Sequence, residues 1–327
     1  MINLALIGIG NWGKNYLKTC KVFPNCHIKY ICAKSTEALD QLDENFIKTT
    51  NYKDFFEYKD IDGVIIATPG STHYKIAKEF IEKGINLLIE KPLSTDYKQA
   101  LQLKTLKNKT HTKILVGHTY LFDPAFIKMK KLITQIGSLR SVSYEAVNNG
   151  PFRSDMSVLW DLGPHAISLL LDLYEQNPIK IKAWAQNYLK PKTNFFDVIN
   201  IEMEFAKCSA VIKIGCLSPI KRRELIVVGT ESTLLYNDLL PNRLTLFEGM
   251  GPEVNSKNIV RKVPKIKYPP YDRILPLQVE LGEFINALSN KLIIKRSNLN
   301  FGIKVTYILS LIEESIKKGG MTVDVQL

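Results

Sequence analysis

Residues 4–13 of this 327-residue chain read LALIGIGNWG. The first four form an apolar run that predicts a buried strand, and helical periodicity follows the glycines. The spacing G-x-G-x-x-G allows a tight turn, close approach of the backbone to a pyrophosphate, and close packing of a helix on a strand. The stretch predicts a dinucleotide site at Gly8, Gly10, Asn11, Trp12 and Gly13, with a purely structural turn as the alternative. Trp12 could also serve only to pack the helix on the sheet.

A βαβ rhythm begins at this stretch and continues to about residue 118. Short apolar runs without polar alternation predict strands covered on both faces, and segments of helical periodicity separate them. The expected strands are Leu4–Ile7, Ile28–Cys32, Gly63–Ala67, Asn86–Ile89 and Ile114–Gly117, and the expected helices are Asn11–Val22, Thr36–Glu44, Thr72–Lys83 and Thr95–Leu106. This alternation predicts a Rossmann domain with a doubly wound parallel sheet over residues 1–119.

The pattern changes after Asp123-Pro124, where the expected strands follow one another without intervening helices. Such a succession predicts mostly antiparallel pairing. The expected elements are a helix at Pro124–Gln135, a strand at Ser138–Val147, a helix at Met156–Glu175, strands that include Ile199–Phe205, Ala210–Gly215 and Glu224–Val228, and helices at Leu277–Leu288 and Asn300–Lys318. Residues 120–327 are therefore expected to form an α+β domain with a large, open, mostly antiparallel sheet.

Composition predicts a soluble, cytoplasmic protein. The chain is 45% hydrophobic, with a mean hydropathy of −0.05. It lacks a basic leader and any run near the roughly 18 apolar residues that a spanning helix needs, so we expect neither a signal peptide nor contact with a membrane. Five cysteines without a C-x-x-C pair favour free thiols in a reducing compartment and predict no metal site.

The formal net charge of +12 has three interpretations. The simplest is a lysine-rich solvated surface, and the second is a positive field that attracts an anionic ligand such as a nucleotide diphosphate. The third is nucleic-acid binding, but no helix-turn-helix, zinc-finger or RNA-binding signature accompanies the charge, so we expect no nucleic-acid partner. The basic clusters are Lys128, Lys130 and Lys131; Lys221, Arg222 and Arg223; and Arg261, Lys262, Lys265 and Lys267.

The end of the second expected strand bears on the choice between NAD and NADP. An NAD-binding domain of this kind usually places Asp or Glu there to bind the ribose 2′-hydroxyl. Here the strand ends in Ala33-Lys34-Ser35, and the next carboxylate is Glu37. A cation and a hydroxyl suit a 2′-phosphate, which favours NADP over NAD; the alternative is that Lys34 is only solvent-exposed.

Three further motifs lie in the order expected of a known family. They are ATPGSTH at residues 67–73, EKP at 90–92 and WDLGPH at 160–165. Together they resemble the Gfo/Idh/MocA oxidoreductases over essentially the whole chain. The resemblance implies a Rossmann domain and a C-terminal domain whose open sheet often forms the oligomer interface, so we expect a homodimer or homotetramer. It also implies a small-molecule substrate bound above the nicotinamide.

The resemblance assigns roles to individual residues. It implies Lys91, Asp161 and His165 as the catalytic constellation. The residues expected along the cofactor are Thr68, Pro69, His73, Glu90 and Lys91, and those expected around the substrate are Lys91, Tyr120, Asn148, Asp161 and His165.

The chemistry of the catalytic residues agrees with these roles. A lysine at the carboxyl end of a parallel strand faces the crevice where such sheets bind ligands, and residues at i and i+4, as Asp161 and His165 are, share one helix face. Lys91 or His165 would exchange the hydroxyl proton during hydride transfer while Asp161 orients them. The alternatives are a surface lysine, a satisfied core histidine and, for Thr72 and His73, merely the first turn of a helix.

Details of three segments narrow the expected substrate. NWGKN at residues 11–15, the form WDLGPH, and GHTYLFDP at 117–124 resemble members that act on nucleotide-linked sugars in polysaccharide or deoxysugar biosynthesis. We therefore expect an NAD(P)-dependent oxidoreductase that transfers a hydride at C3 of such a sugar. A dehydrogenase of a free sugar or cyclitol is one alternative, and a non-catalytic dinucleotide-binding sensor of the same fold is another.

Overall fold

The computed structural model describes residues 1–42, 45–153, 155–189, 193, 195–249, 253–255, 258–260, 263–290 and 292–326. Glu44 of the second expected helix, and Arg261 and Lys262 of the third basic cluster, lie outside these ranges. The chain forms two compact units. The first unit comprises Met1–Phe122 and Leu275–Tyr307, and the second comprises Asp123–Ile274 and Ile308–Leu327.

The first unit contains a parallel sheet of six strands in the order β3-β2-β1-β4-β5-β6. Its strands are β1 Ile2–Ile7, β2 Cys26–Cys32, β3 Ile47–Thr49, β4 Gly63–Ile66, β5 Asn86–Glu90 and β6 Ile114–Gly117. The direction of winding reverses between β1 and β4, and the crevice at such a reversal is where open α/β sheets bind ligands. The predicted Rossmann sheet is confirmed. The sequence did not predict β3, because this edge strand is only three residues long and has a lysine at its centre.

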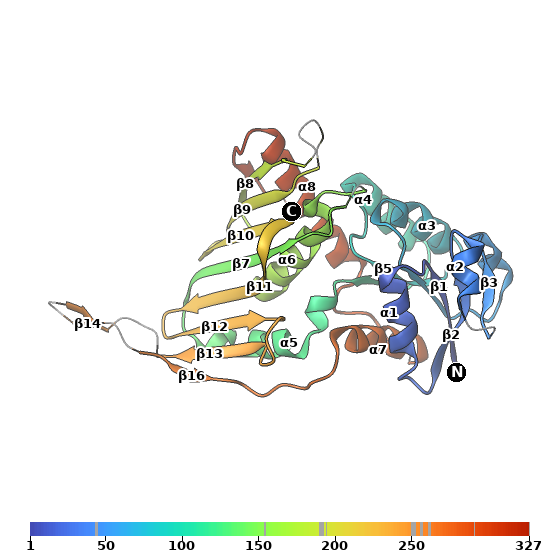
Figure 1. Ribbon diagram of the computed structural model, residues 1–327, viewed down its shortest axis with the longest axis horizontal. Helices are drawn as coiled ribbons and strands as arrows, with labels where there is room; N and C mark the ends of the chain where they lie inside the picture. Colours follow the sequence, from blue (N-terminus) through green and yellow to red (C-terminus); the bar gives the residue numbers. More distant parts are fainter. Residues whose placement is uncertain are drawn as a thin grey trace. The chain divides into compact units, whose positions relative to one another are not determined.

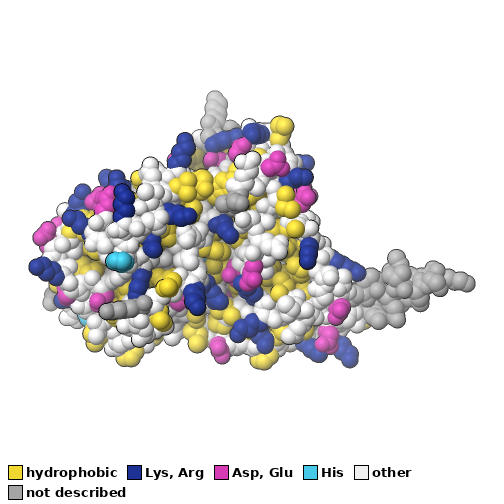
Figure 2. All heavy atoms as spheres, turned by 180° about the vertical axis from the view of Figure 1, so that it is seen from behind, with side chains coloured by type: hydrophobic (Ala, Val, Ile, Leu, Met, Phe, Trp, Pro, Cys, Tyr) yellow, Lys and Arg dark blue, Asp and Glu magenta, His cyan; other side chains and the backbone are white. Residues whose placement is uncertain are grey.

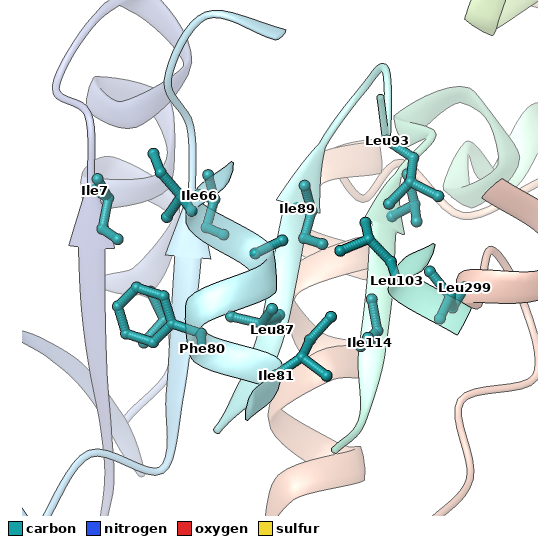
Figure 3. Packing of buried hydrophobic residues seen from close by; sticks show 14 of the residues in the cluster. Ile7, Ile66, Phe80, Ile81, Leu87, Ile89, Leu93, Leu103, Ile114 and Leu299 are labelled. Atoms are coloured by element: carbon teal, nitrogen blue, oxygen red, sulfur yellow. The ribbon is translucent and has the colours of Figure 1, made fainter. Parts of the chain in front are cut away.

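Helices cover both faces of this sheet, which explains the unbroken apolar runs of its strands. The helices and 3₁₀ turns of the first unit are α1 Asn11–Cys20, α2 Thr36–Asp40, η1 Tyr52–Glu57, α3 Gly70–Glu82, α4 Tyr97–Lys107, η2 Thr119–Phe122, α7 Pro276–Ser289 and the start of α8 Leu299–Lys317. Figure 3 shows Ile66 and Ile89 of the sheet packed with Phe80 of α3 and Leu103 of α4. On the opposite face, α7 packs against α1 and β1.

Residues 275–307 belong to the first unit, whereas the expected division placed everything after residue 119 in the C-terminal domain. Long-range side-chain contacts explain the difference. The Tyr16 hydroxyl of α1 and the Glu280 carboxyl group of α7 share a hydrogen bond, and the Lys113 amine donates to the Ala287 carbonyl oxygen. A Cβ at Gly63 would lie 2.9 Å from the Phe284 ring, so α7 sits directly on the sheet. Amphipathic periodicity predicts a helix here but not the sheet against which it packs.

The second unit is built on a nine-stranded sheet in the order β16-β13-β12-β11-β7-β10-β9-β8-β17. These strands are β7 Leu139–Asn149, β8 Lys180–Gln186, β9 Val198–Glu204, β10 Ser209–Gly215, β11 Leu217–Gly229, β12 Ser232–Asn237, β13 Leu244–Glu248, β16 Lys265–Lys267 and β17 Val323–Asp324. A separate hairpin pairs β14 Glu253–Asn255 with β15 Asn258–Val260. Within the large sheet only the β7–β10 pair is parallel among the described residues.

Helices of the second unit leave one face of this sheet open. They are α5 Pro124–Leu132, the 3₁₀ turn η3 Ile133–Gln135, α6 Val158–Tyr174 and the end of α8. α6 packs against β7, β9 and β10, as Figure 1 shows. Burial alternates along β8 and β10, with every second side chain on the helix-covered face. The predicted open, mostly antiparallel sheet is confirmed.

Basic side chains on the surface are interspersed with acidic ones. Figure 2 shows this mixture on the face it displays. Lys130 lies 3.1 Å from Asp172 and 3.0 Å from Glu175, and Arg222 lies 3.0 Å from Glu145. Each of the three basic clusters therefore contains a residue with an acidic partner, which in the third is Lys267, 2.6 Å from Glu248. Among the helices of the described chain, none combines the length and apolar character needed to cross a membrane.

Candidate functional site

The three glycines after β1 differ in what surrounds them. Gly8 has φ +95°, and a Cβ there would lie 2.7 Å from the Ala67 carbonyl oxygen. A Cβ at Gly13 would lie 2.0 Å from the Gly8 carbonyl oxygen, whereas a Cβ at Gly10 would meet nothing within 4 Å. Gly8 and Gly13 are thus required by the turn and by packing. Gly10 instead leaves open space at the N-terminus of α1, where backbone N–H groups and the helix dipole favour a phosphate.

A cavity of about 890 Å³ opens beside these glycines, entirely within the first unit. Its walls are apolar and hydroxyl-bearing, and no described lining residue is acidic. They fit an extended, anionic dinucleotide. The lining residues are Ile7, Gly8, Ile9, Gly10, Cys32, Ala33, Lys34, Ser35, Ala38, Thr50, Tyr52, Ala67, Thr68, Pro69, Thr72 and Ile76.

The end of β2 lies in this cavity as the sequence predicted. Ala33 is buried, Lys34 is exposed, and Ser35 caps α2 by accepting a hydrogen bond from the Ala38 N–H at 3.3 Å. Asn11 and Trp12 lie outside the lining set, in the first turn of α1, and the Trp12 side chain is 37% exposed. The cavity therefore unites Gly8 and Gly10 with Ala33–Ser35 and with Thr68 and Pro69.

His73 lies outside the described lining of this cavity. Its side chain is fully buried. Its Nδ1 lies 2.7 Å from the Pro92 carbonyl oxygen and its Nε2 lies 2.8 Å from the Thr68 carbonyl oxygen. Burial lowers the pKa of His73, and the two carbonyl acceptors oppose this shift. His73 therefore ties the segment after β4 to the segment after β5 and positions both.

Glu90 is also buried, beneath the segment that carries Lys91. It accepts a hydrogen bond from the Tyr16 hydroxyl at 2.8 Å and another from the Lys91 backbone N–H at 3.2 Å. Burial raises the pKa of Glu90 to about 7, although Tyr16 and the positive charge of Lys91 act in the other direction. The Lys91–Pro92 peptide bond that follows is cis. Glu90 therefore holds the backbone of Lys91 in place through the hydrogen bond from the Lys91 N–H.

In the second unit, α6 carries two of the expected catalytic residues. Asp161 lies in its first turn with its side chain 21% exposed, and His165 lies one turn further and is 7% exposed. Close packing holds this part of the helix, since a Cβ at Gly163 would lie 2.7 Å from Leu309 Cδ2. The i, i+4 spacing therefore appears on one helix, as predicted.

A second cavity, of about 330 Å³, brings Asp161 together with Asn148 of β7. Arg153 also lines it, 3.7 Å from the Asp161 carboxylate and bound to Asp155 through two hydrogen bonds of 2.9 and 2.6 Å. Asp161 thus lies beside a cation and an amide in a cavity whose other described walls are mostly apolar. The described lining residues are Asn148, Gly150, Pro151, Phe152, Arg153, Met156, Ser157, Val158, Asp161, Leu162, Leu189, Phe195, Phe196, Asp197 and Cys216.

Lys91 and Tyr120 belong to the first unit, whereas Asn148, Asp161 and His165 belong to the second. Sequence reasoning missed Arg153, Tyr16 and Glu280. Arg153 stands in an irregular segment without periodicity, and only its position shortly before WDLGPH could have drawn notice. Tyr16 follows the glycines by one helical turn, but its partner Glu280 is far away in sequence, and no local pattern joins them.

The strand order, the glycine turn and the open sheet of the second unit define a two-domain, dinucleotide-binding class of protein. Residues 2–118 match the family model described as the oxidoreductase family, NAD-binding Rossmann fold, and residues 126–235 match the Gfo/Idh/MocA C-terminal domain. The chain belongs to the Gfo/Idh/MocA family of oxidoreductases. The expectation of a nicotinamide cofactor, without a distinction between NAD and NADP, is confirmed.

The relatives include enzymes of two substrate classes. Scyllo-inositol 2-dehydrogenase (NADP(+)) IolW of Bacillus subtilis is 24% identical over 60% of this chain and 57% of its own length. UDP-N-acetylglucosamine 3-dehydrogenase of Acidithiobacillus ferrooxidans is 31% identical over 38% of this chain and 39% of its own. The chain thus spans less than two thirds of the length of these relatives.

Solved structures share the fold over nearly the whole chain. An oxidoreductase from Magnetospirillum magnetotacticum MS-1 has a TM-score of 0.82 and 28% identity, covering 94% of this chain and 98% of its own. GenD2 from gentamicin A biosynthesis, in complex with NAD, has a TM-score of 0.85 at 18% identity, covering 100% and 97%. At that identity the second likeness concerns the fold alone.

Proposed function

We propose that this protein transfers a hydride between the nicotinamide of NAD(P) and a CH–OH carbon, with C3 of a nucleotide-linked sugar as the reacting position. The observation that carries the proposal is the cavity beside the glycine turn of the first unit, where Gly10 leaves open space for a pyrophosphate. The EKP segment begins at the end of β5 in the same sheet. The UDP-N-acetylglucosamine 3-dehydrogenase among the relatives supports the substrate class.

In this mechanism, side chains of the protein exchange the proton of the substrate hydroxyl. Bound cofactor supplies the hydride acceptor or donor. Either Lys91 or His165 exchanges the hydroxyl proton, the other hydrogen-bonds the same oxygen, and Asp161 orients them. Tyr120 and Asn148 would contact the rest of the sugar. Lys34 would pair with a 2′-phosphate, since no described acid lines the cavity around it, and this favours NADP.

A free sugar or cyclitol is the second candidate, and one observation favours it. Arg153 is the only cation among the described residues that line the cavity around Asp161, and it is already bound to Asp155. That cavity therefore offers little positive charge to a diphosphate, whereas Asn148 and Asp161 supply hydrogen-bonding groups for a neutral polyol. The inositol dehydrogenase among the relatives agrees with this candidate.

A substrate panel followed at the nicotinamide absorbance band tests both candidates. The panel pairs UDP- and TDP-linked hexoses with inositols and free hexoses, each with NAD(H) and NADP(H), and the Lys91→Ala variant serves as the blank. We expect turnover of a nucleotide sugar. Turnover confined to free polyols would select the second candidate. Tight cofactor binding without turnover of any compound would contradict the enzyme and favour a sensor.

We also propose a homodimer or homotetramer formed through the open face of the large sheet. Trp184 of β8 and Val211 of β10 are 43% and 52% exposed on strands whose alternate residues are buried. An exposed apolar sheet surface of this kind is typical of an interface. Sedimentation velocity should show an oligomer that Val211→Lys dissociates. A monomeric wild-type protein would contradict the proposal.

A further inference from the structure

Three polar side chains form a chain of hydrogen bonds inside the first unit. The Tyr16 hydroxyl oxygen lies 2.8 Å from Glu90 Oε1 and 2.9 Å from Glu280 Oε1. Tyr16 comes from α1, Glu90 from the end of β5 and Glu280 from α7. Tyr16 and Glu280 are fully buried, and Glu90 is 4% exposed. Two carboxyl groups therefore share one hydroxyl in a dry interior.

This arrangement requires one proton more than a neutral tyrosine and two ionised glutamates carry. A tyrosine hydroxyl has a single proton, and an ionised carboxylate can only accept. Tyr16 can therefore donate to one of the two glutamates but not to both. The other contact is a hydrogen bond only if that second carboxyl group carries its own proton and donates it to the tyrosine oxygen. Two ionised carboxylates at this spacing would also repel each other.

The surroundings place the extra proton on Glu280. Its Oε2 atom is buried and lacks a hydrogen-bond partner among the described residues, whereas Glu90 also accepts the Lys91 backbone N–H. Burial, followed by the charge of Glu90, raises the pKa of Glu280 well above its usual value. The resulting chain is directed: Glu280 donates to Tyr16, and Tyr16 donates to the Glu90 carboxylate.

Other charged and polar groups face this chain from each neighbouring element. Lys91 follows Glu90 on the same segment, and its positive charge also lowers the pKa of the buried His118. A hydrogen bond with Thr119 of η2 lowers the pKa of Glu280, and the charge of Glu283 of α7 raises it, while burial raises it most. Arg296 in turn faces Glu283 and lowers its pKa, although burial raises the pKa of Glu283 more. Among these groups, Lys91 is therefore the cation whose charge acts on Glu90.

We propose that Glu280, Tyr16 and Glu90 form a buried proton relay that sets the charge beside Lys91. When the Glu280 proton moves to the Tyr16 oxygen, the Tyr16 proton moves to Glu90. Two O–H bonds break, two form, and the total charge is unchanged. Glu90 thereby alternates between a carboxylate and a neutral acid, so the charge directly before Lys91 changes. The three are positioning residues, and their effect on turnover rests on the proposed role of Lys91.

Infrared spectroscopy of the intact protein tests the relay without any turnover. Glu280→Gln keeps the shape and a hydrogen bond but removes the acid. We expect the wild-type protein at neutral pH to show the carbonyl stretch of a protonated buried carboxyl group, and Glu280→Gln to lose it. Tyr16→Phe should shift this band, because it removes the acceptor of the proton. Tyr74→Phe, which removes a hydroxyl bonded to Gln102 on the surface, is the matched control and should change nothing.

The pH profile of kcat tests the link to Lys91. Glu280→Gln keeps a neutral partner for Tyr16 but removes the proton that Glu280 passes on toward Glu90, so the limb that Glu90 controls should move to lower pH by about one unit. Cofactor affinity should stay near that of the wild type. Superimposable infrared spectra of wild type and Glu280→Gln would overturn the relay itself. The expected infrared loss with an unmoved kcat profile would overturn its action on Lys91. Absence of turnover on every substrate would instead count against the proposed function.

Discussion

The cofactor cavity of the first unit and the cavity around Asp161 in the second unit are built in different ways. The first depends on backbone, since its phosphate end consists of a glycine turn and the N-terminus of α1. The second depends on side chains from β7, α6 and irregular segments of the second unit. A backbone site needs particular residues at a fixed local spacing, whereas a side-chain site needs only that distant residues meet. Local sequence therefore predicts the first far better than the second.

The largest effect should come from the backbone site. Gly10→Val should abolish dinucleotide binding, because its side chain would enter the space reserved for the pyrophosphate. The fold should survive, since a Cβ there meets nothing within 4 Å. Titration calorimetry with NADPH and a thermal melt measure the two properties.

Gly13→Ala is the matched comparison within the same turn. Its Cβ would lie 2.0 Å from the Gly8 carbonyl oxygen, so we expect a loss of about 1–3 kcal/mol in the free energy of unfolding. Unchanged cofactor affinity in Gly10→Val, or a lower melting temperature for Gly10→Val than for Gly13→Ala, would remove the distinction between the two glycines.

Substitutions in a side-chain site should lower turnover more than they lower cofactor binding. Lys91→Ala and His165→Ala should each lower kcat by about 10²–10⁴-fold, the usual contribution of a positioned acid or base. The cofactor dissociation constant should change much less. Lys98→Ala on the exposed surface of α4 and His27→Ala on β2 are controls of the same residue types. Near-native kcat in either variant would show that the substituted residue has no catalytic role.

Two buried groups, one in each unit, should respond in opposite directions to acid. Burial lowers the pKa of His118 in the first unit from 6.5 to about 3. Between these values the unfolded chain binds a proton that the folded one does not, so stability falls as the pH drops below about 6.5. Burial raises the pKa of Asp123 in the second unit above its usual value, despite the ion pair with Arg243. Its contribution therefore rises in acid.

Urea unfolding at pH 7 and pH 5 separates these contributions. His118→Asn should reduce the loss of stability in acid by about 2 kcal/mol, roughly 1.4 kcal/mol per pH unit below the unfolded pKa. Asp123→Asn should instead remove the gain in stability that Asp123 contributes in acid. A wild-type stability that is flat over this range and unaffected by His118→Asn would show that His118 is protonated in the folded state.

The smallest effect concerns cofactor preference. Restoring an acid with Ala33→Asp adds an acceptor for the 2′-hydroxyl and repels a 2′-phosphate. A partly solvated pair between Lys34 and that phosphate contributes about 1 kcal/mol, so the wild-type preference for NADPH should be only about fivefold. Dissociation constants for NADPH and NADH, measured at one ionic strength on both proteins, check this. Tighter binding of NADH by the wild type, unmoved by the substitution, would place Lys34 outside the cofactor site.

Particular elements show how far local pattern reaches. The runs that became β1, β4, β5 and β6 were predicted because helices cover both faces, so the interior residues of these strands are apolar. The i, i+4 spacing of Asp161 and His165 was likewise predicted, because one helix carries both. β3 was missed because a three-residue edge strand buries little. The placement of α7 was missed because its periodicity says that one face is buried, not what buries it.

By itself, the sequence determined the Rossmann order, the glycine turn, the open second sheet and the motifs that identify the family. Each of these depends on residues a few positions apart, and the geometry of a strand, turn or helix relates such residues directly. Only the tertiary structure decided that His73 ties two loops together, that Arg153 lies beside Asp161, and that Tyr16 lies between Glu90 and Glu280. These contacts join residues from separate elements, and the packing of one buried surface on another, which local periodicity does not encode, brings them together.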